Sequence, residues 1–262
     1  MGSNSLPGTS RGVKLPGSLF LGLKSRWGIW MMSNVLHMPL GITNCYLVPG
    51  SQGYIMVDGG SLRKEKEFRT RLRREGIDPE LIRLIIITHA HYDHIGSLAG
   101  IKKICNSPVL AHPLEARIMR EGNIVIPPGT NLMGDIISCI GKKARSLLAF
   151  EPVDCEIMAD QEQRLEEYGV AGKILVTPGH TAGSLSVLLD NGNAMVGDLA
   201  VNWPGRSFYP PFAEMPSEIY YSWNKIMQQG AQNIFPGHGR PFSVACLQQQ
   251  LQNLGPSVCW PT

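Results

Sequence analysis

The strongest constraint on the fold is a run of four aliphatic residues that ends directly in a cluster of polar residues. Leu84 to Ile87 follow one another without interruption, inside a strand that we expect at 83–88. A strand without polar alternation is typically covered on both faces. The chain must therefore build a sheet that carries further layers on both of its sides.

Short strands and helices alternate along the rest of the chain. They come in two successive groups and lack the glycine fingerprint of a doubly wound sheet, so we expect two similar units. The expected fold is α/β, with mixed sheets that helices cover on both outer faces. The pattern predicts further strands at 42–48, 54–57, 108–111, 173–177, 184–189 and 194–196, and helices at 62–75, from 95 onward, at 114–121, 216–229 and 244–254.

The length of 262 residues allows one large domain or two small ones. Residues 1–18 are rich in Gly, Ser and Pro, and we expect a flexible leader there because such a segment buries too little apolar surface to offset its ordering entropy. Residues 19–262 contain no second linker of this composition. A single domain is therefore predicted for 19–262.

Charge and hydropathy exclude several kinds of partner. Lys and Arg number 24 against 21 Asp and Glu, which gives no support for binding to nucleic acid. No apolar run reaches the roughly 18 residues of a membrane span, and the N-terminal apolar patches are too interrupted for a secretory signal. The 6 cysteines include no Cys-x-x-Cys pair, as expected of buried reduced thiols. We expect a cytoplasmic protein that acts on a small molecule and binds neither nucleic acid nor membrane.

Five of the 7 histidines lie in three short segments, each directly after an expected strand. The segments are THAHYDH at 88–94, PGHT at 178–181 and PGHG at 236–239, and Asp198 ends a further strand in the same way. Side chains at strand ends converge on a common edge of a sheet, so these groups can form one pocket.

The first segment is dense in groups that bind metal ions. His89 and His91 are one residue apart, so in an extended strand end their imidazoles point to the same side and can bind one cation. Asp93 and His94 follow in the turn and can face a second ion. Imidazoles combined with carboxylates suit Zn²⁺, and also Fe or Mn. The sequence thus predicts a metal site.

These motifs carry a family resemblance. THAHYDH, with VDGG upstream at 57–60 and TPGHTAGS, GD and PGHG downstream, resembles the metallo-β-lactamase superfamily of metal-dependent hydrolases from about 42 to 241. The resemblance implies a four-layer αββα sandwich with two divalent ions at one edge of the facing sheets. It also implies that Asp58 orders the ligand loop. By the same resemblance His89, His91 and His180 would hold the first ion, Asp93, His94 and His238 the second, and Asp198 would bridge them.

Two such ions could share a hydroxide, and we expect it to attack a carbonyl group. Asp93 is a candidate for proton transfer to the leaving group, and Tyr209 for a hydrogen bond to the developing oxyanion. Two other histidines lie outside the ligand set. His112 is expected at a helix start or behind the ligands, and His37 has no visible partner.

Within the superfamily the chain is most similar to the lactonase and glyoxalase II groups, which open esters, lactones or thioesters. A glutathione thioester is disfavoured because only about twenty residues follow Pro241. A β-lactam hydrolase and a mononuclear iron persulfide dioxygenase are the alternatives. The apolar segments 27–32 and 132–150 could wall an acyl pocket, or could be ordinary core or dimer-contact helices, which leaves a homodimer open.

Overall fold

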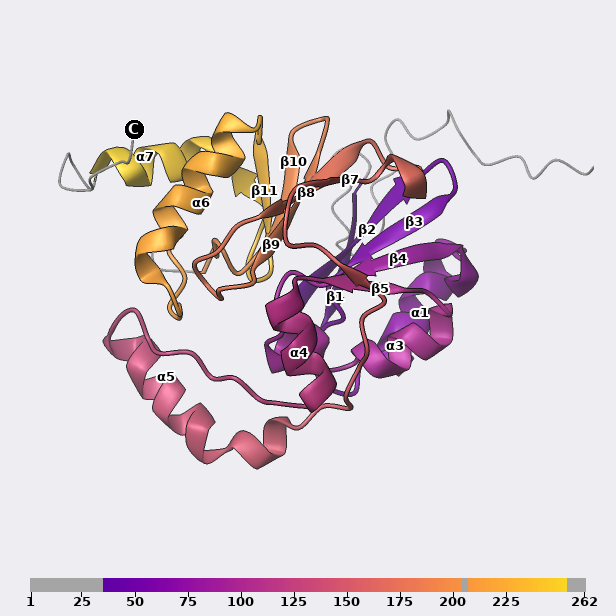
Figure 1. Ribbon diagram of the computed structural model, residues 1–262, viewed down its shortest axis with the longest axis horizontal. Coiled ribbons are helices and arrows are strands. Elements are labelled where there is room, and N and C mark those ends of the chain that lie inside the picture. Colours follow the sequence, from indigo (N-terminus) through magenta and orange to yellow (C-terminus); the bar gives the residue numbers. More distant parts are fainter. Residues whose placement is uncertain (1–34, 204–206, 254–262) are drawn as a thin grey trace, which may run out of the picture.

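Two six-stranded sheets face each other in the computed structural model, which describes residues 35–203 and 207–253 (Figure 1). The first sheet has the strand order β1 (Leu36–Leu40), β2 (Thr43–Gly50), β3 (Gly53–Val57), β4 (Ile82–Ile86), β5 (Val109–Ala111), β6 (Ile157–Met158). The second has the order β12 (Phe242–Ser243), β11 (Asn233–Pro236), β10 (Asn193–Gly197), β9 (Leu185–Leu189), β8 (Gly172–Val176), β7 (Gln163–Arg164).

Both sheets are mixed, as the sequence predicts. In the first, β1, β2 and β3 are antiparallel neighbours, whereas β3, β4, β5 and β6 run parallel. In the second, only β10 and β11 are parallel. The turn expected after Asp190 joins β9 to β10, and Gly192 has the positive φ of 84° that such a turn requires.

Helices cover the outer face of each sheet and complete four layers (Figure 1). α1 (Glu65–Glu75), α3 (Leu98–Cys105) and α4 (Pro113–Glu121) share an apolar cluster with the first sheet. α6 (Pro216–Gln228) and α7 (Ala245–Asn253) share another with the second sheet. Two further helices, α2 (Tyr92–Ile95) and α5 (Leu132–Lys143), lie in the connections. The predicted αββα sandwich is confirmed.

The run Leu84–Ile87 is buried on both faces of its sheet. Leu84 and Ile86 belong to the cluster between the two sheets, together with Phe235 of β11. Ile85 and Ile87 belong to the cluster beneath α1, α3 and α4. An alternating polar residue would have faced apolar neighbours on either side, which is why the strand has none.

Some structure was not expected from the sequence. β1 carries Pro39, which reads as a strand breaker, but β1 pairs only with β2 and so lies at the edge of its sheet, where proline is tolerated. The expectations for 1–18 and 27–32 concern residues outside the described ranges. None of the described helices is long and apolar enough to span a membrane.

Candidate metal centre

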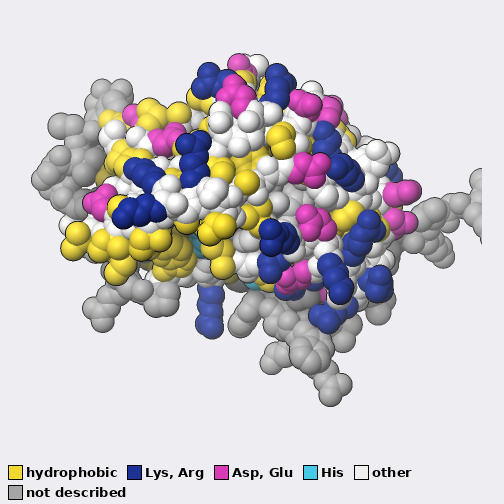
Figure 2. All heavy atoms as spheres, turned by 90° about the horizontal axis from the view of Figure 1, so that it is seen from below, with side chains coloured by type: hydrophobic (Ala, Val, Ile, Leu, Met, Phe, Trp, Pro, Cys, Tyr) yellow, Lys and Arg dark blue, Asp and Glu magenta, His cyan; other side chains and the backbone are white. Residues whose placement is uncertain are grey.

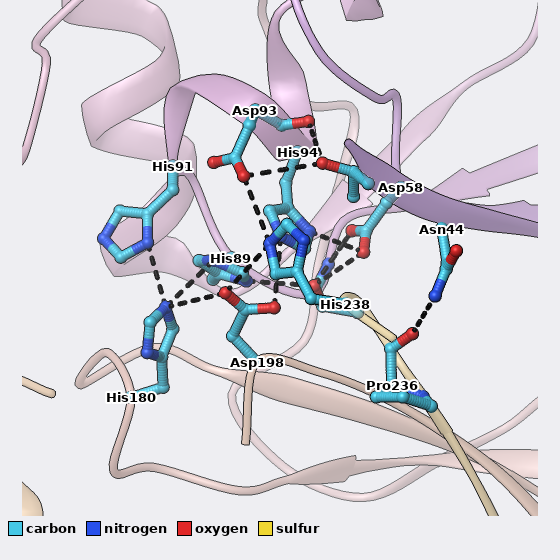
Figure 3. Close-up of polar contacts among 12 residues, drawn as sticks. Asn44, Asp58, His89, His91, Asp93, His94, His180, Asp198, Pro236 and His238 are labelled. Carbon is cyan, nitrogen blue, oxygen red and sulfur yellow. Dashed lines mark hydrogen bonds and ion pairs between the residues drawn. The ribbon is translucent and has the colours of Figure 1, made fainter. Parts of the chain in front are cut away.

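Four loops bring the predicted ligands to one edge of the facing sheets (Figure 3). His89 and His91 follow β4, and Asp93 and His94 lie in α2 directly after them. The remaining three ligands follow three strands of the second sheet, His180 after β8, Asp198 after β10 and His238 after β11.

All seven candidate ligands meet in three overlapping groups. Within each group the potential ligand atoms lie within 4.8 Å of one another. Asp198 lies between the other residues, because its Oδ2 is 3.7 Å from His180 Nε2 and 3.4 Å from His238 Nε2. The groups are His89, His91 and His180; Asp93, His94 and His238; and His89, His94 and Asp198.

The donor set fits a metal ion. Three buried atoms of the cluster, His91 Nε2, His94 Nε2 and Asp198 Oδ1, make no hydrogen bond of good geometry among the described residues, although the last two lie 3.3 Å apart as an ion pair. Burying polar atoms without partners costs free energy that a bound cation would recover. The cluster could therefore hold metal ions through imidazole and carboxylate donors.

The first group consists of neutral imidazoles. Burial and the neighbouring His180 lower the pKa of His91 to about 3. Burial also lowers the pKa of His89 and of His180. Neutral imidazole is the form that binds a cation, so these three residues are ready to do so at neutral pH.

The second group and Asp198 carry charges. Burial alone lowers the pKa of His238, but Asp198 and Asp93 outweigh it and raise that pKa to about 10. Asp198 and Asp58 likewise raise the pKa of His94 well above its ordinary value. In return, His238 and His94 hold the pKa of the buried Asp198 well below its usual range. Without a metal these histidines are therefore protonated and paired with ionised carboxylates.

Backbone carbonyls orient two of the histidines. His180 Nδ1 donates to the Phe212 carbonyl at 2.8 Å, and His238 Nδ1 donates to the Ile42 carbonyl at 3.0 Å. With the proton held on Nδ1, Nε2 of each ring faces the cluster. This is how ligating histidines are commonly fixed.

Asp58 orders the first loop, as the resemblance implied. It lies at the end of β3 in a left-handed backbone conformation, with φ of 64°. Its carboxylate accepts hydrogen bonds from the backbone N–H and the hydroxyl of Thr88, each at 2.9 Å, and lies 2.9 Å from His94 Nδ1. Asp58 thereby joins the start of the loop to one of its ligands.

Glu115 was not predicted to belong to the site. This α4 side chain is 2% exposed, and its carboxylate accepts from the Ala90 N–H and the Thr181 hydroxyl, both at 2.7 Å. Ala90 lies between His89 and His91, and Thr181 follows His180. Glu115 thus connects the two loops of the first ligand group, a contact between segments too distant in sequence for any local pattern to reveal.

The structure places Tyr209 away from the ligands. Its hydroxyl donates to the Pro216 carbonyl at 2.7 Å, and its ring packs against Tyr220 and Trp223 on α6. These contacts turn it toward the outer apolar cluster, and Tyr209 is not among the described residues that line the cavity beside the ligands. Two histidines outside the cluster also have defined contacts: His112 caps α4 as expected, whereas His37, expected to have no partner, lies 2.7 Å from the side-chain oxygen of Asn44.

A cavity of about 200 Å³ lies beside the ligand cluster. His91, Asp93, His180, Asp198 and His238 form its polar wall. Among the described residues no Lys or Arg lines it. As the sequence suggested, the segment 132–150 contributes to it. The apolar wall includes Ile126, Pro127, Ile137, Leu148, Trp203 and Phe212.

Comparisons with known proteins agree with the fold and the motifs. A family model described as the metallo-beta-lactamase superfamily matches residues 38–238. The chain belongs to the metallo-β-lactamase superfamily, a family of metal-dependent hydrolases. A probable metallo-hydrolase of Methanocaldococcus jannaschii is 27% identical over 200 residues, which are 75% of this chain and 87% of that protein.

Solved structures share the fold at lower sequence identity. A metallo-beta-lactamase superfamily protein of Sulfolobus tokodaii has a TM-score of 0.63 at 19% identity, over 87% of this chain and 89% of that one. TTHA1623, solved in a di-iron-bound form, has a TM-score of 0.61 at 22% identity, over 81% of this chain and 96% of that one. These similarities concern the fold alone.

Proposed function

We propose that this protein hydrolyses an ester, lactone or thioester with the help of two divalent ions, zinc in the first place and iron or manganese as alternatives. The observation that carries the proposal is the meeting of seven buried ligand groups, among which His91 Nε2 is buried without any hydrogen-bond partner among the described residues. One ion would be held by His89, His91 and His180. The other ion would be held by Asp93, His94 and His238, and Asp198 would contact both ions. A pair of bound cations supplies hydroxide at neutral pH, because it lowers the pKa of water from about 15.7 to about 7.

The chain's own residues bind and orient the substrate beside this centre. The apolar wall of the cavity takes the acyl part, while its polar wall faces the scissile carbonyl. Asp93 is suited to carry a proton to the leaving group. Burial raises its pKa, but His238 and His94 outweigh this and lower it, so the carboxylate is ionised and can accept a proton. Asp93 Oδ2 lies 3.2 Å from His238 Nε2, which holds it at the polar wall.

The cavity favours an uncharged apolar acyl group. The described lining offers no Lys or Arg to bind the carboxylate of a glutathione thioester or of a β-lactam, which disfavours both as substrates. An iron dioxygenase that uses a single ion would not need the second group of Asp93, His94 and His238. A simple ester, a lactone or an acyl thioester without a charged acyl part is therefore the proposed substrate.

Two measurements test the proposal. Elemental analysis of purified protein should give two metal ions per chain, and hydrolysis of acyl-lactones and p-nitrophenyl esters should exceed that of a cephalosporin and of a phosphodiester. Chelation should remove activity, and added zinc should restore it. One iron per chain together with oxygen uptake would instead support the dioxygenase alternative, and full activity after exhaustive chelation would refute metal-dependent hydrolysis.

A further inference from the structure

The α5 helix exposes its large aliphatic side chains and buries its small ones. Leu132, Met133 and Ile140 are 77%, 64% and 61% exposed, and Ile136 is 48% exposed. In most surface helices the apolar face points to the core instead. We call Leu132, Met133, Ile136 and Ile140 the α5 stripe, because their spacing places them along one face of the helix.

Contacts on the inner face fix this orientation. Gly134 lies so close to Pro211 that a Cβ atom there would overlap the Pro211 carbonyl. Ser138 is buried, and its hydroxyl donates to the Pro127 carbonyl at 2.8 Å. Rotating α5 to bury the stripe would break these contacts, so the aliphatic face stays outward.

The stripe lies on an accessible side of the molecule. α5 stands at the lower margin of the fold in Figure 1, apart from the other helices. The view from below in Figure 2 shows hydrophobic side chains gathered on this side, with basic groups beside them. A continuous apolar surface of this kind marks an interaction site.

We propose that the α5 stripe packs against the same stripe of a second copy of this chain, with the two helices antiparallel. The charges on the helix favour this occupant. Asp135 lies in the first turn and Lys142 and Lys143 in the last. An antiparallel pair places Asp135 of each copy next to the two lysines of the other, so one surface is complementary to itself, as a twofold interface requires. A parallel pair would instead oppose like charges.

Pairing would also act on the cavity. Ile137 and Gly141 of α5 and the following Leu148 line it, while the stripe faces away from it. A second copy would therefore hold one wall of the cavity in place without adding residues to the metal centre. The pairing itself does not depend on the proposed hydrolysis.

The first test is the oligomeric state. The full chain should sediment at about twice its mass of 28.8 kDa, and Ile136→Glu should convert it to a monomer. Leu114→Glu is the matched control, since Leu114 is 42% exposed in the first turn of α4, where an acid is tolerated, and it should leave the dimer intact. Circular dichroism establishes that both variants fold. A wild-type monomer, or a dimer that Ile136→Glu does not weaken, overturns the proposal.

A charge swap tests the orientation. Two variants should each weaken the dimer several-fold, because each brings like charges together. The first carries Asp135→Lys alone, and the second carries both Lys142→Asp and Lys143→Asp. The triple variant restores opposite charges in both halves of the interface and should recover most of the affinity. A triple variant as weak as the separate changes would refute the antiparallel arrangement.

Cys139 provides an independent readout. It is exposed, and with Asp135 opposite Lys142 the twofold axis passes close to it. A short bis-maleimide should therefore link two copies through Cys139, and Cys139→Ser should abolish the link. A monomer whose Cys139 resists the reagent would assign the stripe to another segment of the same chain. If the chain is a monomer that binds anionic vesicles, and Ile136→Glu abolishes this binding, the α5 stripe would instead be assigned to a lipid surface. Either result overturns the proposal.

Discussion

The metal centre and the α5 helix depart from ordinary packing in opposite ways. At the metal centre, charged and polar groups are buried, with His94 completely enclosed and Asp93 only 8% exposed. On α5, large aliphatic side chains face outward. Buried polar groups and exposed apolar patches are the informative exceptions to the rule that apolar residues lie inside. Each therefore points to something that the chain alone does not supply, a cation in the first region and an apolar partner in the second.

The two regions also differ in how their geometry is held. The ligand loops are fixed by hydrogen bonds that they donate to Asp58, Glu115 and backbone carbonyls. α5 is held by few inner contacts, chiefly those of Gly134 and Ser138. Changes at the metal centre should thus remove function outright, whereas changes near α5 should adjust substrate binding.

The largest effect is expected from Asp198→Ala. Asp198 faces His94, His180 and His238, so its loss removes the donor shared by both proposed ions. Metal content should fall, and kcat/KM should fall by more than about 100-fold, beyond what loss of a group behind the ligands costs. Elemental analysis and ester hydrolysis provide the two readouts.

The control for this change is Asp190→Ala, which removes an exposed carboxylate that pairs with Arg164 at the surface. It should retain both metal and activity. If Asp198→Ala retained its full metal content and turnover, the metal centre would have to be sought elsewhere.

Glu115→Ala should have the next largest effect. It leaves the buried Ala90 N–H without its acceptor, which costs about 1–3 kcal/mol, and it removes one of the two partners of the Thr181 hydroxyl, the other being the Ser184 hydroxyl. It should also lower metal affinity about 10- to 100-fold, because the loops of His89, His91 and His180 lose their link. Thermal unfolding and metal titration measure the two consequences.

Glu115→Gln separates positioning from general stability. The amide oxygen can still accept from Ala90, and the amide nitrogen can donate to the Thr181 hydroxyl, so most of the metal affinity should return. Equal metal binding by the wild type and by Glu115→Ala would show that the link between the loops does not position the ligands.

The proton balance of metal binding distinguishes the two ligand groups. His238, with a pKa of about 10, and His94, with a raised pKa, must lose their protons before they bind a cation. Affinity at that group should therefore increase as pH rises toward 10, by about tenfold per pH unit for each proton released. The group of His89, His91 and His180 has lowered pKa values, so its affinity should be nearly constant at neutral and higher pH.

Calorimetry in buffers of different ionisation enthalpy counts the protons released by each ion. We expect almost none for the tighter ion, and for the weaker one or two from the histidines in addition to the proton of the water that becomes hydroxide. Equal proton release by both ions would contradict the difference between the groups.

The smallest effect is expected in the cavity. Leu148 lines it, whereas the adjacent Leu147 is 78% exposed. Leu148→Ala should raise KM for an apolar acyl ester by about fivefold to tenfold, which corresponds to about 1–1.4 kcal/mol, the lower part of the range for a lost methylene contact. Leu147→Ala should leave KM unchanged. If both variants behaved alike, the acyl group would not occupy this cavity.

Short patterns in the amino-acid sequence were enough to predict the layered fold and the ligand candidates. Leu84–Ile87 needed cover on both faces, and the histidines followed strands, so both features could be read from short local patterns. Pro39 concealed β1, since proline excludes an inner strand and only the pairing shows that β1 lies at an edge.

The way in which helices and loops turn relative to the sheets could not be predicted in this manner, because it depends on packing in three dimensions. The tertiary structure brought Glu115 between two ligand loops, turned Tyr209 toward α6 and left the aliphatic face of α5 outward. Each of these outcomes depends on contacts between segments far apart in the chain, such as Gly134 against Pro211. Local periodicity says that a helix has an apolar face, but long-range packing alone decides whether that face is buried.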